Sequence, residues 1–102
     1  MKLVVAPEAA AQILVRKRWW RANRSKAPER FDDELAAALV AITERPESFP
    51  VFSARAGRTV RRCLLAKTRC HFYFEVVDVA NEVWLIAARG AAQRRRPRLA
   101  RR

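Results

Sequence analysis

With 102 residues, 51% of them apolar, the chain is long enough for one domain with a hydrophobic core and is too apolar for a disordered segment. Two cysteines do not make a disulfide framework, and no apolar run approaches the roughly 20 residues of a membrane span. The net charge of +12 implies an anionic partner: nucleic acid, a phosphate-rich particle such as the ribosome, an acidic protein segment or a membrane surface.

The positive charge is concentrated in the second half of the sequence. Residues 51–102 hold 13 basic and three acidic residues, against nine basic and seven acidic residues in 1–50. The apolar run at residues 3–6 is too short for the core of a signal peptide. We therefore expect a soluble, cytoplasmic protein.

The first two elements are predicted to be a short strand at residues 2–6 and a helix at residues 7–23, opened by Pro7. The expected apolar stripe of this helix is Ala10, Ile13, Leu14 and Trp20. Trp19 and Trp20 are 100° apart on a helix, so one of them is expected to be partly exposed. The basic residues of the helix form either a solvated face or a contact surface for an acidic partner.

A second helix is predicted from Pro28 to just before Pro46. It has the strongest periodic pattern of the chain, formed by Phe31, Leu35, Ala38, Leu39 and Ile42. Acidic residues in its first turn, Asp32, Asp33 and Glu34, suit the positive end of the helix dipole. The short link between the helices predicts an antiparallel helical hairpin.

The rest of the chain is predicted to form strands. Residues 51–52 begin one strand, and residues 59–65, 70–77 and 83–88 form three more with short connections, as in an antiparallel meander. In the last strand, Val83, Leu85 and Ala87 are expected on one face and Trp84 and Ile86 on the other.

These elements predict an α+β fold with an N-terminal strand, an antiparallel helical hairpin and a three- to four-stranded antiparallel sheet. We expect a single domain at residues 1–93. Residues 94–102 contain six arginines and no acid, and we expect them to form a basic, flexible tail.

The strand at residues 70–77 alternates between two kinds of side chain. Phe72, Phe74 and Val76 point to one face, and His71, Tyr73 and Glu75 point to the other. This period of two is typical of a half-buried strand. The first face is expected to close the core, and the second to present polar groups to a partner.

The inventory of catalytic groups is short. His71 is the single histidine, and a histidine in mid-strand is more often structural than catalytic. The cysteines and the histidine do not have the spacing of a zinc site, and two glycines do not make a phosphate-binding loop. We expect no metal and no cofactor. Cys63 and Cys70 flank a predicted turn and are expected to be free thiols in a reducing cytosol.

What remains is a basic face that also carries aromatic residues. It comprises Arg61 or Arg62, Lys67, Arg69, His71, Tyr73 and Arg89, followed by the arginines of the tail. Arginines can stabilise the charge of a phosphorane during phosphodiester cleavage, or they can simply bind phosphates. Composition leaves both alternatives open.

Several motifs, in this order, resemble the RelE/ParE superfamily of toxins from bacterial type II toxin–antitoxin modules. The motifs are PEA at residues 7–9, WWRANR at 19–24, APERF at 27–31, DEL at 33–35, RRCLL at 61–65 and FYFEV at 72–76. The resemblance covers nearly the whole chain. It implies a compact toxin fold, a cognate antitoxin whose acidic segment wraps the toxin in a hetero-oligomer, and growth arrest when the toxin is free. It implies no membrane partner.

The resemblance implies two alternative targets. RelE-like members cut mRNA on the ribosome with basic sheet residues and a C-terminal tyrosine or histidine; here the candidates are Arg62, Lys67, Arg69, Tyr73 and Arg89. ParE-like members lack that set and inhibit DNA gyrase. No tyrosine or histidine follows Tyr73, which favours the ParE-like alternative.

The expected contacts with the target or the antitoxin are Arg61, Arg62, Arg69, His71, Tyr73, Arg89, Arg94, Arg95 and Arg96. A third alternative, from a different class, is a non-toxic basic module that binds nucleic acid. Its binding would weaken steeply with salt.

Overall fold

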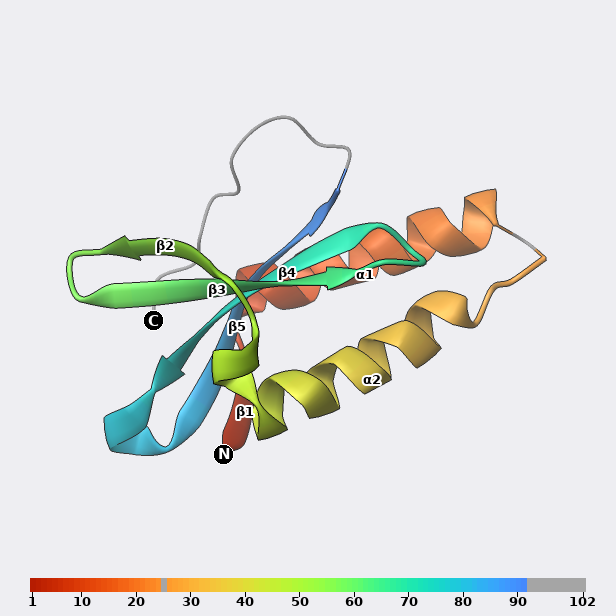
Figure 1. The fold of residues 1–102 in the computed structure, drawn as a ribbon. Coiled ribbons are helices and arrows are strands. Elements are labelled where there is room, and N and C mark those ends of the chain that lie inside the picture. Colours follow the sequence, from red (N-terminus) through yellow and green to blue (C-terminus); the bar gives the residue numbers. More distant parts are fainter. Residues whose placement is uncertain (25, 92–102) are drawn as a thin grey trace.

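The computed structural model describes residues 1–24 and 26–91, which form one twisted sheet with two helices packed against it (Figure 1). The elements are β1 (Lys2–Val5), α1 (Pro7–Asn23), α2 (Arg30–Glu44), β2 (Val51–Arg55), β3 (Arg58–Leu65), β4 (Cys70–Val77) and β5 (Glu82–Gly90). The strand order is β1-β5-β4-β3-β2, with β1 parallel to β5 and the other pairs antiparallel. The predicted fold class is confirmed. The domain boundary at residue 93 and the predicted tail lie outside the described residues.

Helix α1 has the predicted bounds, with Pro7 in its first turn. Its inner face differs from the expected stripe, because Ala9 and Trp20 are buried whereas Leu14 is 46% exposed. The expected exposure of one tryptophan is confirmed, since Trp19 is 41% exposed. In the described part of the chain, no helix is long and apolar enough to cross a membrane.

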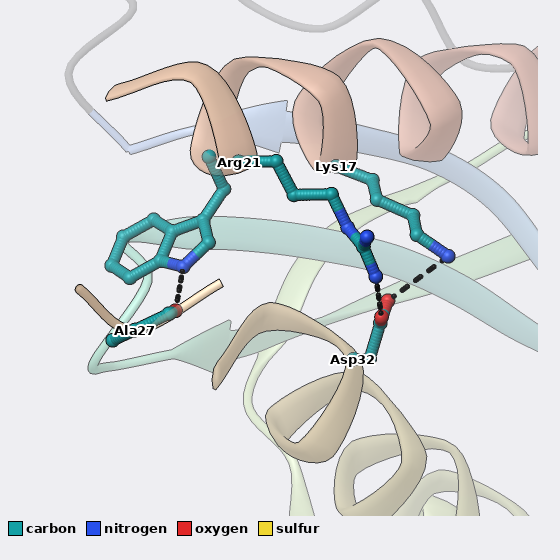
Figure 2. Close-up of polar contacts among 5 residues, drawn as sticks. Lys17, Arg21, Ala27 and Asp32 are labelled. Carbon is teal, nitrogen blue, oxygen red and sulfur yellow. Dashed lines mark hydrogen bonds and ion pairs between the residues drawn. The ribbon is translucent and has the colours of Figure 1, made fainter. Parts of the chain in front are cut away.

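Side-chain bonds hold the end of α1 to the start of α2. The indole N–H of Trp20 donates to the carbonyl of Ala27 at 2.7 Å. Lys17 and Arg21 lie 3.3 and 3.0 Å from the carboxylate of Asp32 (Figure 2). The hydrogen bond from Arg21 holds the pKa of Asp32 below its usual value. Surface ion pairs of this kind stabilise a protein by less than about 1 kcal/mol each, so the buried indole is the stronger attachment.

Helix α2 begins at Arg30 rather than at the predicted Pro28. Pro28 lies in a turn in which the N–H of Arg30 donates to the carbonyl of Ala27, so the chain turns before the helix starts. The periodic face is otherwise as predicted: Phe31 and Ile42 are fully buried in the core.

The sheet supplies the other half of the core. Helix α1 packs against β5 and α2 against β3, and Phe72 and Phe74 of β4 are completely buried. A β-bulge interrupts the β4–β5 ladder, because Tyr73 opposes Ala87 while Phe74 opposes Leu85. The extra residue moves Ala87 to the face of Tyr73, so the prediction that Ala87 shares a face with Leu85 is wrong.

The turn between β3 and β4 is fastened to α2 by Glu34. Its carboxylate accepts hydrogen bonds from the backbone N–H groups of Lys67 and Thr68, at 2.8 and 2.9 Å, and from the hydroxyl of Thr68. Burial raises the pKa of Glu34, but these hydrogen bonds outweigh it, so the pKa lies below its usual value. The charged carboxylate is therefore the form that stabilises the fold.

Replacing Glu34 with glutamine is expected to lower the free energy of unfolding by about 1–2 kcal/mol at neutral pH, because hydrogen bonds to a charged acceptor are lost. A depressed folded-state pKa contributes stability above the unfolded-state pKa and loses it as the pH falls through the folded-state value. The difference between wild type and Glu34→Gln should thus shrink as the pH falls through the folded-state pKa of Glu34, which lies below its usual value. Urea unfolding between neutral and acid pH measures it. A difference that stays constant with pH would contradict this role.

Candidate functional site

Side chains from β3, β4 and β5 meet on the sheet surface that faces away from the helices. Arg62 opposes Tyr73, and His71 lies between Leu64 on β3 and Arg89 on β5. Directly opposed residues of antiparallel strands share one face. The predicted alternation of His71 and Tyr73 against Phe72 is thus confirmed. We call this surface the open face; it is formed by Phe52, Arg62, Leu64, His71, Tyr73, Ala87 and Arg89.

An aromatic cluster underlies the open face. The rings of Phe52 and Tyr73 meet edge to face with centroids 4.8 Å apart, and the guanidinium of Arg62 lies 5.6 Å from the Phe52 centroid. Tyr73 is only 4% exposed. The aromatic packing therefore buries the phenol and presents the guanidinium.

His71 lies beside this cluster and is half-buried. Its Nδ1 is 3.5 Å from the hydroxyl of Tyr73. Burial, together with the charges of Arg62 and Arg69, lowers the pKa of His71. The imidazole is therefore neutral at neutral pH, and the positive charge of the open face comes from its arginines.

Glu75 belongs to the same side of β4 but is committed to an ion pair. Arg58 donates to its carboxylate through Nη2 at 2.6 Å and Nε at 3.2 Å. The Glu75 side chain is 3% exposed, and its hydrogen bond raises the pKa of Arg58. A carboxylate so enclosed has a structural role, and it leaves the charge of the open face positive.

The structure brings Arg62, His71, Tyr73 and Arg89 of the predicted set together and places the others elsewhere. Arg61 points to the opposite side and donates to the carbonyl of Phe49 at 2.8 Å. Lys67 and Arg69 lie in or beside the β3–β4 turn. The three tail arginines Arg94, Arg95 and Arg96 lie outside the described residues. The roles predicted for all these residues stay predictions.

Sequence reasoning missed Phe52 as part of this surface. Phe52 is the additional residue of a bulge, because Val51 opposes Arg61 while Ser53 opposes Val60. A bulge reverses the direction of the side chains that follow it. Its position could not be predicted from the composition or from the alternation of apolar and polar residues.

Thiol and metal chemistry are not features of the open face. Cys63 opposes Phe72 and Cys70 opposes Leu65, so both thiols lie on the side that packs against the helices. Burial raises the pKa of Cys70 to about 11, which keeps it a protonated, unreactive thiol. Among the described residues, no group of three His, Cys, Asp or Glu side chains is close enough to hold a metal ion.

The described residues thus form a helical hairpin packed on a mixed sheet, with the N-terminal strand parallel to the last strand. The isolated E. coli RelE toxin has a similar crystal structure, with a TM-score of 0.58 and 18% sequence identity over 91% of this chain and 86% of that chain. No protein-family model and no curated protein matches the sequence. The predicted α+β fold is therefore shared with the RelE toxin.

Proposed function

We propose that this chain is the toxin of a type II toxin–antitoxin pair, neutralised by a cognate antitoxin, and that the free toxin arrests growth by ParE-like inhibition of DNA gyrase. The RelE toxin fold and the net charge of +12 support the toxin class. A strongly basic toxin suits an acidic antitoxin segment that covers it. Gyrase is a cytoplasmic target, and the cytoplasm is where we place the chain.

The side chains of the open face are the observation that favours gyrase over the ribosome as the target. Arg62 and Arg89 lie opposite Tyr73 and His71 on this face and are half-buried, and the phenol of Tyr73 is buried beneath Phe52. The sequence has no tyrosine or histidine after Tyr73 to transfer a proton from the C-terminal side. A face with fixed cations and few proton-transfer groups is better suited to binding a macromolecule than to cleaving one.

A supercoiling assay tests this proposal. The purified full-length chain at micromolar concentration is expected to block supercoiling of relaxed plasmid by gyrase, and pre-incubation with the antitoxin encoded beside its gene should restore activity. The same preparation is added to translating ribosomes as the second arm. Normal supercoiling at micromolar toxin would overturn the gyrase assignment.

The second candidate is a RelE-like, ribosome-dependent mRNA endoribonuclease. It is favoured by one observation: the neutral imidazole of His71 lies directly between Arg89 and the strand that carries Arg62. A neutral imidazole can accept a proton from a 2′-hydroxyl while arginines stabilise the phosphorane. In the ribosome arm this candidate predicts codon-positioned cuts that are lost in Arg69→Ala or Arg89→Ala. If neither arm responds and expression leaves growth unchanged, the non-toxic nucleic-acid-binding module is the better assignment.

A further inference from the structure

A basic hollow lies apart from the open face, between the last turns of α1 and the turn that joins β3 to β4. Its volume is about 380 Å³, within the range of ligand sites. We call it the turn pocket; it is lined chiefly by Arg16, Trp19, Arg24, Lys67, Arg69 and Gly90. Four of these six residues are cationic, and the described lining contains no carboxylate.

The four cations are free to meet an anion. None of them forms an ion pair with a carboxylate of the described residues. The guanidinium of Arg24 donates to the neighbouring carbonyl of Asn23 at 3.2 Å and to no carboxylate of the described residues. The nearby carboxylate of Glu34 already accepts hydrogen bonds from the turn itself. Guanidinium groups without a carboxylate partner match the oxygens of a phosphate.

Arg16 is held in a fixed position within the turn pocket. Its guanidinium donates to the carbonyl of Thr68 at 3.3 Å and lies 4.5 Å from the Trp19 ring centroid. A Cβ at Gly90 would come within 3.3 Å of the Arg16 guanidinium. The absence of a side chain at Gly90 therefore allows this guanidinium to lie against β5. A cation fixed in this way loses little conformational entropy when a ligand arrives.

Trp19 supplies a flat apolar surface beside these cations. Its neighbour Trp20 is buried, whereas Trp19 is 41% exposed although guanidiniums approach it on the helix. An exposed indole surrounded by cations is the combination that binds a base and its phosphate in single-stranded nucleic acids.

The turn pocket continues into a second hollow of about 520 Å³ along α1 and β5. The two share Arg16, Trp19 and Gly90, and the second extends to Arg89 at the margin of the open face. We infer that the turn pocket is a binding site for single-stranded nucleic acid, with one base against Trp19 and phosphates on Arg16, Arg24, Lys67 and Arg69. Gyrase inhibition does not require this site.

Fluorescence anisotropy of a labelled oligothymidylate of about eight nucleotides tests the inference with the full-length chain. Trp19→Ala is expected to weaken binding roughly 5- to 100-fold, as removal of a stacking platform does, and Trp19→Phe to recover most of the loss. Leu14→Ala, another exposed apolar residue of α1 outside both hollows, should bind like wild type. Equal affinity of Trp19→Ala and Leu14→Ala would overturn the site.

The salt dependence tests the phosphate contacts. Arg24→Ala is expected to lower the slope of log affinity against log salt by about 0.7, the contribution of one phosphate contact on a single strand. Arg55→Ala removes the same charge from the far end of β2 and should leave the slope unchanged. Competition with thymidine monophosphate, inorganic phosphate and a polyglutamate peptide identifies the ligand. At matched charge concentration, release of the oligonucleotide by thymidine monophosphate would indicate a site for a free nucleotide. Release by inorganic phosphate would indicate a site for any anion, and release by polyglutamate a site for an acidic protein. Each of these results would contradict the inference.

Discussion

Replacing Trp20 with alanine is expected to lower the free energy of unfolding by about 3–5 kcal/mol, whereas Trp19→Ala lowers it by less than about 1 kcal/mol. The two residues are identical and adjacent, but Trp20 is 6% exposed and Trp19 41%. Trp20→Ala leaves a large cavity and also removes the bond that attaches α1 to the helix connection at Ala27 (Figure 2). Urea unfolding followed by circular dichroism measures both variants.

Trp20→Phe separates packing from hydrogen bonding. It keeps most of the buried ring but removes the N–H donor to the carbonyl of Ala27, so a loss of about 1–2 kcal/mol is expected. Equal destabilisation by Trp19→Ala and Trp20→Ala would contradict the assignment of Trp20 to the core. The same unfolding measurement checks that Trp19→Ala is folded well enough for the binding measurements.

The alternating pattern of β4 and the bounds of α1 could be predicted from the sequence because both are local. An alternation of period two runs through six residues around Tyr73, and Pro7 marks a helix start wherever it is followed by helix-forming residues. For the adjacent tryptophans, the sequence predicts that one of the two is exposed, because they are 100° apart on a helix. It does not predict which one, because that depends on the orientation of α1 over β5.

Features that depend on distant pairing could not be predicted. The parallel pairing of β1 with β5 joins Lys2 to Glu82, and no local pattern encodes it. The bulges that place Phe52 and Ala87 on the open face each insert one residue without a change of composition. The same holds for the turn pocket, in which α1 meets a turn about 50 residues later in the chain.

The double variant Arg62→Ala/Arg89→Ala is expected to abolish growth arrest. These two residues supply guanidiniums of the open face, one on β3 and one on β5, on either side of the strand that carries His71. Truncating a charged contact residue costs about 2 kcal/mol or more, so removing both weakens target binding roughly 1000-fold. The proposed binding of the target depends on these two cations, and the double variant removes both.

Two controls accompany the double variant. Arg18→Ala/Arg55→Ala removes the same charge from exposed positions on α1 and β2, and it should remain toxic. His71→Asn keeps a neutral polar side chain but removes the imidazole. The His71→Asn variant should remain toxic if the open face only binds its target, and it should lose toxicity if His71 transfers a proton.

Viable counts after induced expression, with folding of each variant checked by circular dichroism, test the central claim most directly. The wild-type chain and Arg18→Ala/Arg55→Ala are expected to reduce viable counts strongly, while cells that express Arg62→Ala/Arg89→Ala keep growing. Full toxicity of a folded Arg62→Ala/Arg89→Ala variant, or no effect of the wild-type chain on growth, would contradict a toxin that acts through its open face.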